Sequence, residues 1–467
     1  MVEVGKNQIP SDSNNVRWES SANTMTAQPL NEPILGYSPG SPERNSIIQE
    51  IDRQMSETIE IPCIINGEEV FTGHTIPQVI PHDHGHILAN VHLAGREEME
   101  SACSAAVNAQ RSWIEIGLEE RCKIFEKCAD LLAGDWRMRV NASTMLNQSK
   151  TVFQAEIDSA CELIDFWRFN CHYARGFHDD FQPLVSPEGV VNSTDIRPLE
   201  GFVLSITPFN FTSIAANLPS APAIVGCTSV WKPSRNSYYS NYYLMRLMME
   251  AGLPPGVINF LPGSGAEITE VALSNPNFAG LHFTGSTATF QGLWQEIGLA
   301  LPKLNSYPRI VGETGGKDFV VAHPDCDRRG LVVALLRGAF EYQGQKCSAA
   351  SRAYIPRSVW EGISDELSDE IGKIAMGDAR DFTNFMTAVI DKRAFDKISG
   401  YIQRATERDS CEVFCGGGCD DTVGYFIEPT IILTEDPNSE SMIEEIFGPV
   451  LTCLLYTSDA ADDSLRV

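Results

Sequence analysis

"GFVLSITPFNFTSIAANLPSAPAIVGCTSVWKPS", the sequence of residues 201–234, places a short apolar run on either side of a helical pattern. Residues 201–206 and 228–232 are predicted to be buried strands, because both runs are short and contain β-branched and aromatic side chains. Residues 213–226 are predicted to form a helix, although this segment contains prolines. A strand, a helix and a strand in this order predict a βαβ unit with parallel strands.

The same alternation continues toward the C-terminus. A further helix is predicted over 242–252, and further strands over 256–261, 280–283 and 308–313. A second alternating stretch runs from 319 to about 450 and includes a predicted hairpin at 414–429. The chain is therefore predicted to be an α/β protein with two domains.

The region before these alternating strands and helices has a different pattern of polar and apolar residues. Residues 1–60 are polar and contain Pro and Ser, so they are predicted to wrap the surface rather than to form a core. From 97 to about 177, apolar residues recur at a spacing of three and four, which predicts helices. A strand-like piece follows near 187–198.

The composition limits the class of function. The chain has 467 residues, which exceeds what one hydrophobic core usually serves. It carries 35 basic and 62 acidic residues, a net charge of −27, which argues against a nucleic-acid groove and against adhesion to anionic membranes. The sequence has no apolar run of 18 residues, so no transmembrane span is predicted.

The cysteines indicate a reducing compartment. There are thirteen, scattered and without a secretory signal, which does not suit a disulfide scaffold. Residues 1–25 carry only one Lys and one Arg, so they make at most a weak transit peptide.

Cys347 differs from the other twelve cysteines because it follows the polar run 343–346. A structural cysteine normally belongs to an apolar pattern, whereas a reactive thiol needs access and a setting that favours the thiolate. Asn210 follows a predicted strand and could donate a hydrogen bond to an oxyanion, although asparagine is also common in turns. Glu313 ends another predicted strand and precedes two glycines, which suits a general base as well as a surface carboxylate.

Two further strand ends could bind a nucleotide. Lys232 ends the strand at 228–232, where its ammonium could contact a ribose or phosphate or simply face solvent. Residues 285–287 lead into a helix whose first N–H groups could bind a pyrophosphate, or whose serine could be a plain N-cap. The sequence lacks the G-x-G-x-x-G fingerprint of ordinary dinucleotide sites.

Two clusters resemble metal sites only superficially. "PHDHGH" (81–86) has alternating histidines, but no acid or thiol is fixed nearby by spacing. "CEVFCGGGC" (411–419) spaces its cysteines by four, unlike zinc or iron–sulfur motifs, and is better interpreted as a glycine-rich turn. No metal site is predicted.

Together these pieces resemble the aldehyde dehydrogenase superfamily. Six motifs carry the resemblance in order, at 208–211, 231–234, 283–287, 313–317, 344–347 and 444–449. Within the superfamily the chain is similar to the Δ1-pyrroline-5-carboxylate dehydrogenases, in "NEPILGYSPGSPER" (31–44), "QAEIDSACELIDFWRFN" (154–170), "AFEYQGQKCSA" (339–349) and Phe290, where most relatives have a glycine. The resemblance runs from about residue 31 to about residue 453.

The resemblance implies a covalent mechanism. The Cys347 thiolate would attack the aldehyde carbon, and the Asn210 amide and the Cys347 backbone N–H would hold the oxyanion. Hydride would pass to NAD, and Glu313 would activate the water that hydrolyses the thioester. The implied reaction is the oxidation of L-glutamate 5-semialdehyde to L-glutamate in proline degradation.

The resemblance also assigns binding residues and domains. Phe211 and Ser348 would contact the small-molecule substrate. The domains would be an NAD-binding domain at 61–312, with oligomerisation strands near 187–198, and a catalytic thiol domain at 313–453. The residues that would bind NAD are Thr207, Lys232, Gly285, Ser286, Thr287, Ala288, Thr289, Glu445 and Phe447.

The end of the chain departs from the family pattern. Residues 454–467 match nothing expected of the family, so they are predicted to be a non-family tail on an incomplete catalytic domain, from a frameshift, a truncated transcript or a foreign sequence. The part predicted to be missing includes the loop that anchors the substrate carboxylate. It also forms much of the oligomer contact, which argues against the family's homo-oligomer, a dimer or larger, for this chain.

Two alternative functions remain open at this stage. One is another semialdehyde dehydrogenase of the superfamily, and the other is an inactive NAD-binding fragment. NADP could also replace NAD. The N-terminal extension favours the mitochondrial matrix, and a bacterial source would mean the cytoplasm.

Overall fold

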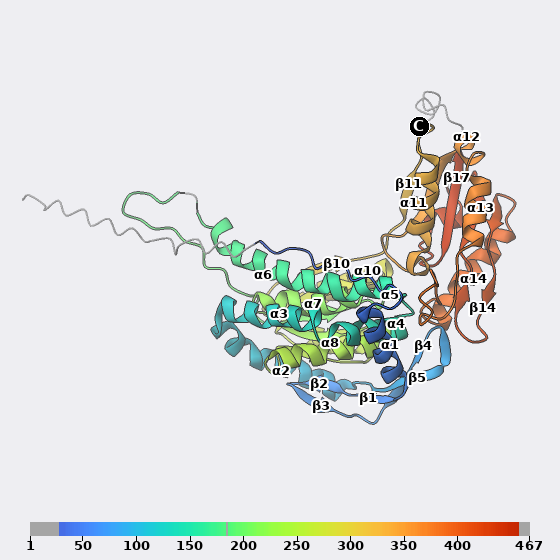
Figure 1. Cartoon of the computed structure of the whole chain (residues 1–467). Helices are drawn as coiled ribbons and strands as arrows, with labels where there is room; N and C mark the ends of the chain where they lie inside the picture. Colours follow the sequence, from blue (N-terminus) through green and yellow to red (C-terminus); the bar gives the residue numbers. More distant parts are fainter. Residues whose placement is uncertain (1–27, 184, 457–467) are drawn as a thin grey trace, which may run out of the picture.

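The computed structural model describes residues 28–183 and 185–456, and Figure 1 shows two α/β bodies. The larger body contains the first sheet and the helices up to α10 (Thr287–Ala300). The smaller body contains the strands and helices that follow β10 (Arg309–Glu313), beginning with β11 (Asp318–Val321). The mixed α/β class predicted from the sequence is confirmed.

The first sheet has seven strands in the order β10-β9-β6-β7-β8-β2-β3. Its five parallel strands are the five predicted ones: β6 (Phe202–Ile206), β7 (Thr228–Lys232), β8 (Ile258–Phe260), β9 (Phe278–Thr284) and β10. The antiparallel strands β2 (Cys63–Ile65) and β3 (Glu68–Val70) extend it. The order reverses between β6 and β9, and α/β sheets bind ligands at such a switch point.

The predicted helices are present, and the helical region 97–177 is divided into several. The bounds are α2 (Arg96–Glu115), α3 (Gly117–Ala133), α4 (Arg137–Gln148), α5 (Val152–Ala155), a π-helical turn (Glu156–Cys161), α6 (Glu162–Asp180), α7 (Thr212–Ile224), α8 (Tyr238–Ala251) and α9 (Gly265–Ser274).

Helix α7 contains two internal prolines, and the carbonyl that one of them leaves free finds other partners. Pro222 cannot donate to the carbonyl of Leu218. That carbonyl instead accepts a hydrogen bond from Ser205 Oγ at 3.2 Å and contacts His282 Nδ1 at 2.9 Å. Side chains from the neighbouring strands β6 and β9 therefore provide hydrogen bonds to the carbonyl that Pro222 leaves free.

The prediction for the N-terminal segment is partly wrong. Helix α1 (Pro42–Met55) packs on α4, and its Ile47 and Ile51 are buried in the main core. Spacing by four places both on one helix face, so α1 joins the core rather than only wrapping it. The possible transit peptide at 1–25 lies outside the described residues.

The second domain is built on a five-stranded sheet in the order β11-β12-β17-β16-β13. Its further strands are β12 (Ala350–Pro356), β13 (Cys411–Cys415), β16 (Thr430–Thr434) and β17 (Val450–Tyr456), and its helices are α11 (Arg328–Phe340), α12 (Arg357–Trp360), α13 (Ser364–Gly372), α14 (Lys392–Thr406) and α15 (Glu440–Ile443). The predicted hairpin is confirmed, because β14 (Cys419–Asp420) pairs with β15 (Phe426–Ile427). Strand β17 runs past residue 453, and 457–467 lie outside the described residues.

A third sheet contacts the second domain, where the backbone N–H of Tyr425 donates to the carbonyl of Pro81. The sheet contains β1 (Ile59–Ile61), β5 (Asp83–His92) and β4 (Thr75–Ile80) in that order. One strand predicted from the sequence is absent from the structure. Residues 187–198, all described, form no strand in the single chain, where they have no neighbouring strand to pair with. Val191 in this segment is 85% exposed. Within 28–183 and 185–456, no helix is long and apolar enough to cross a membrane.

Candidate active site

A cavity of about 420 Å³ opens where the first sheet meets the second domain. Residues that follow β6 and β9 line one side of it, at the switch point of the sheet. Cys347, the start of α14 and residues 445–447 line the other side. Eight predicted site residues line this cavity: Thr207, Asn210, Gly285, Ser286, Thr289, Cys347, Glu445 and Phe447.

The backbone before Cys347 is unusual. Tyr342, Gln343 and Gly344 have φ values of 50°, 55° and 65°, so three consecutive residues are left-handed. Only glycine fits the third position, because a Cβ there would lie 2.2 Å from the carbonyl oxygen of Gly448. Strained residues of this kind persist where the surrounding structure fixes them, and they cluster at functional sites.

Buried glutamine side chains hold this strained segment. Gln343 Nε2 donates to the carbonyl of Ala388 at 2.7 Å, and Gln345 Oε1 accepts from the backbone N–H of Ile390 at 2.9 Å. Both glutamines are almost fully buried. The polar run before Cys347 therefore contains two buried anchors, which fix residues 342–347. We call this segment the nucleophile loop, after the role predicted for Cys347.

Asn210 faces the same loop. Its Nδ2 donates to the carbonyl of Gln345 at 3.0 Å, and only 5% of the residue is exposed. This long-range contact differs from the local hydrogen bond that a turn-forming asparagine makes. The side-chain amide thus lies beside Cys347 in the wall of the cavity.

The negative charge of Glu313 affects the pKa of the Cys347 thiol. Burial and the negative charges of Glu313 and then Glu445 raise the pKa of the Cys347 thiol above its ordinary value, although nearby backbone N–H groups oppose this. Glu313 itself is exposed at the end of β10 and does not line the cavity.

The start of α10 forms one side of the cavity, where the sequence predicts nucleotide contacts. Ser286 caps this helix, and its Oγ accepts from the N–H of Thr289 at 3.3 Å. A Cβ at Gly285 would lie 2.7 Å from the Phe283 ring, so a larger residue would displace the turn. Thr287 and Ala288 are exposed on the same turn but outside the cavity lining.

Two other predicted contacts differ in their surroundings. Thr207 Oγ1 accepts a hydrogen bond from Trp231 Nε1 at 3.0 Å, which fixes it at the end of β6. Burial lowers the pKa of Lys232 to about 8. Lys232 lies at the end of β7, near the start of α9, and outside the cavity lining.

Residues 445–447 reach the cavity from the second domain. Glu445 Oε1 accepts from the N–H of Gly316 at 3.2 Å, and a Cβ at Gly315 would lie 1.9 Å from the Glu445 carboxylate. Phe447 has a φ of 61°, and its ring packs edge-on against Phe209 at 5.9 Å. The glycines after Glu313 therefore admit Glu445 to the site.

The two predicted substrate residues do not line the cavity. Ser348 is exposed, and the Phe211 ring lies 4.5 Å from Lys150 Nζ. The cavity is also lined, from the start of α14, by three residues that no sequence pattern indicated: Asp391, Arg393 and Lys397. No local sequence motif predicts their place in the cavity, because it depends on how the second domain packs against the first.

The side chains of the two motifs that superficially resemble metal sites have other roles. The histidines make hydrogen bonds, and the cysteines lie in strands. His82 Nδ1 lies 2.8 Å from Ser149 Oγ, and His84 Nε2 lies 2.9 Å from the carbonyl of Asp421. Cys415 ends β13, and Cys419 lies in β14. Across 28–183 and 185–456, no group of three His, Cys, Asp or Glu side chains is placed to hold a metal ion.

The Aldehyde dehydrogenase family model matches residues 70–463. The chain belongs to this family. The match reaches into the segment 454–467, which the sequence analysis predicted to lie outside the family pattern.

Two relatives of this aldehyde dehydrogenase are identical to it at 42–48% of the aligned positions. The Delta-1-pyrroline-5-carboxylate dehydrogenase of Agaricus bisporus is 48% identical over 439 residues, covering 94% of this chain and 80% of that protein. The human mitochondrial Delta-1-pyrroline-5-carboxylate dehydrogenase is 42% identical over 453 residues, covering 97% and 80%.

Solved structures agree with this assignment. The Mycobacterium tuberculosis Delta-pyrroline-5-carboxylate dehydrogenase bound with NAD matches with a TM-score of 0.90 and 47% identity, covering 94% of this chain and 80% of that one. The predicted family and the two-domain aldehyde dehydrogenase fold are confirmed.

Proposed function

We propose that the chain oxidises L-glutamate 5-semialdehyde, the open form of Δ1-pyrroline-5-carboxylate, to L-glutamate with NAD, in the degradation of proline. The names and high identity of its relatives support the substrate. The observation that carries the chemistry is the strained, anchored loop that holds Cys347 in the cavity beside Asn210.

In this proposal Cys347 is the nucleophile. Its thiolate forms a bond to the aldehyde carbon, and the carbonyl electrons move to the oxygen. The Asn210 amide and the Cys347 backbone N–H donate to that oxyanion. After oxidation to the thioester, Glu313 takes a proton from the water that releases the carboxylic acid.

The wall of the cavity fits NAD. The capped N-terminus of α10 presents backbone N–H groups beside Gly285, an arrangement that suits a pyrophosphate. Thr207, Ser286 and Thr289 also line this side. Lys232, which lies outside the lining at the end of β7, would approach the adenosine ribose. Glu445 and Phe447 would hold the nicotinamide ribose on the opposite wall. When bound, NAD supplies the hydride acceptor that the reaction needs.

The remaining assignments belong to the same proposal. Phe211 and Ser348 would contact the substrate, and residues 61–312 and 313–453 would be the NAD-binding and catalytic domains. If the chain forms the homo-oligomer expected of the family, residues 187–198 would pair with another subunit. The mitochondrial matrix is the proposed location, because eukaryotic relatives are named mitochondrial.

A comparison of substrates tests the proposed function. NADH formation from glutamate semialdehyde should exceed that from semialdehydes lacking the α-amino group, measured as kcat/KM. A preference for one of the latter would assign the chain to another semialdehyde dehydrogenase. No NADH from any aldehyde would contradict the enzymatic proposal.

Labelling of thiols provides a test that needs no substrate. Iodoacetamide should alkylate Cys347 faster than the eight buried cysteines, because its thiol lines the cavity, and NAD should change the rate at Cys347 but not at the exposed Cys419. Peptide mass spectrometry would measure each rate. Uniform labelling would contradict the assignment of Cys347 as nucleophile.

Substitution of Glu313 by Gln should make Cys347 more reactive. Because burial and then the Glu313 charge raise the thiol pKa, removing that charge should lower the pKa and increase the thiolate fraction below it. Alkylation at neutral pH should become about two- to tenfold faster. The rate measured against pH should show the curve displaced to lower pH, and an unchanged or higher midpoint would contradict the prediction.

A further inference from the structure

We propose that Asp158 is a positioning residue for the nucleophile loop, because its carboxylate holds Lys346, the residue that precedes Cys347. This inference rests on the proposed role of Cys347. Asp158 lies in the π-helical turn Glu156–Cys161, nearly 190 residues before the loop in the sequence.

Two ammonium groups converge on one carboxylate oxygen. Asp158 Oδ2 lies 2.6 Å from Lys150 Nζ and 3.1 Å from Lys346 Nζ. Lys346 Nζ also donates to Gln154 Oε1 at 2.6 Å. The Lys150 side chain is fully buried and that of Asp158 is 5% exposed, so water contributes little to this cluster.

The same cluster packs against the strained backbone of the loop. Lys150 Nζ lies 4.3 Å from the Tyr342 ring and 4.5 Å from the Phe211 ring. Tyr342 begins the left-handed segment, and Phe211 directly follows Asn210. The lysine therefore contacts the loop at one end, while the Lys346 ion pair holds it at the other.

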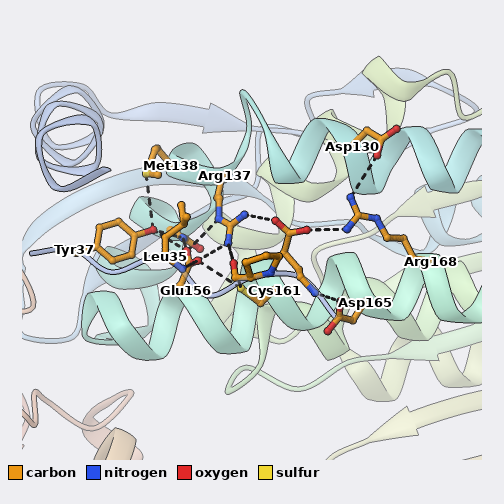
Figure 2. Close-up of polar contacts among 12 residues, drawn as sticks. Leu35, Tyr37, Asp130, Arg137, Met138, Glu156, Cys161, Asp165 and Arg168 are labelled. Atoms are coloured by element: carbon orange, nitrogen blue, oxygen red, sulfur yellow. Dashed lines mark hydrogen bonds and ion pairs between the residues drawn. The ribbon is translucent and has the colours of Figure 1, made fainter. Parts of the chain in front are cut away.

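The π-helical turn explains why a carboxylate reaches this place. It carries two buried carboxylates, Glu156 and Asp158. Glu156 binds Arg137, as Figure 2 shows, whereas Asp158 binds the lysines. An extra residue in a π-turn redirects the side chains around it, and such turns are frequent at functional sites.

Charge balance makes Asp158 necessary. Burial lowers the pKa of Lys150 to about 8, and the Asp158 charge opposes this shift while Lys346 adds to it. The other carboxylate near the lysines, Glu162, accepts from Ser213, and burial raises its pKa. Without Asp158 the two ammonium groups would repel each other, and Lys346 would leave its position.

Hydrogen exchange measures this positioning directly. In Asp158→Asn and in Lys346→Met, the amides of peptide 341–352 should exchange about 10- to 100-fold faster than in the unchanged chain. The double variant should show a smaller increase than the two single effects combined, because both changes break the same ion pair between Asp158 and Lys346. The kcat should fall about 10- to 100-fold in parallel, with KM for NAD unchanged.

Ser159→Ala is the matched control from the same turn. Ser159 Oγ donates to Asn141 Oδ1 at 2.7 Å and does not contact Lys346, so its loss should leave exchange of 341–352 unchanged. Unchanged exchange in folded Asp158→Asn, additive effects in the double variant, or equal opening in Ser159→Ala would each overturn the proposal. If Asp158→Asn does not fold, Lys346→Met alone decides.

The exchange readout separates this inference from the proposed function. Uniform thiol labelling of the unchanged chain would refute the role of Cys347, whatever the loop does. Selective labelling of Cys347 with unchanged exchange in the variants would refute only the role of Asp158.

Discussion

Replacing Cys347 by alanine should lower NADH formation by about 10⁴-fold or more, because the covalent path has no other nucleophile. Binding of NAD should be retained, since the predicted NAD contacts lie on other elements and the loop is held by Gln343 and Gln345. Steady-state rates with glutamate semialdehyde and fluorescence titration with NADH would measure the two effects. The circular dichroism and thermal midpoint of the variant should match those of the unchanged chain.

Cys419→Ala is the matched control for this prediction. Cys419 is an exposed thiol in β14, distant in sequence from the loop and outside the cavity lining. Its replacement should leave kcat unchanged. If Cys347→Ala kept a substantial part of the activity, another group would have to form the covalent bond, and the mechanism proposed above would be wrong.

The sequence predicted the sheet well because a parallel strand carries its signal locally. Each of the five strands from β6 to β10 is a short apolar run, and its last residues must lie at the same edge of the sheet. Asn210, Ser286 and Glu313 could be placed at that edge from their positions alone. Cys347 could also be identified from local sequence, because it follows a polar run whereas a structural cysteine normally belongs to an apolar pattern.

The parts that the sequence did not predict depend on packing between distant segments. Arg393 and Lys397 line the cavity only because α14 lies beside the loop that carries Cys347. Residues 154–170 indicated the branch of the superfamily from the sequence alone. The contacts that their side chains make could not be predicted, because they depend on the π-helical turn at Glu156–Cys161. In the structure, Gln154 and Asp158 bind Lys346, whereas Glu156 binds Arg137.

Glu156, near the start of the same segment 154–170, fastens the N-terminal strap, defined here as residues 31–37. Arg137 Nη2 donates to Glu156 Oε1 at 2.5 Å and to the carbonyl of Pro33 at 2.8 Å. Glu156 in turn accepts from the N–H of Leu35 at 2.8 Å and from the Tyr37 hydroxyl at 2.7 Å. Figure 2 shows Leu35 and Tyr37 beside Glu156, which in turn contacts the Arg137 guanidinium.

Replacing Arg137 by methionine should therefore lower the free energy of unfolding by about 3–5 kcal/mol, because Glu156 would remain buried without its counter-charge. Burial favours protonation of Glu156, but the hydrogen bonds from Arg137, Leu35 and Tyr37 outweigh it and lower its pKa. The stabilisation should thus be present above the ordinary glutamate pKa and be lost as pH falls through the lowered value. Urea titration at neutral and acidic pH would measure both effects.

Arg96→Met is the control for this stability prediction, because Arg96 pairs with Glu100 and Glu270 on the exposed surface. Its replacement should leave the unfolding midpoint almost unchanged. In Arg137→Met the amides of 31–37 should exchange faster, since the strap loses the contacts at Pro33 and Glu156 together. A loss of only about 1 kcal/mol, typical of an exposed pair, would contradict the view that this buried pair fastens the strap.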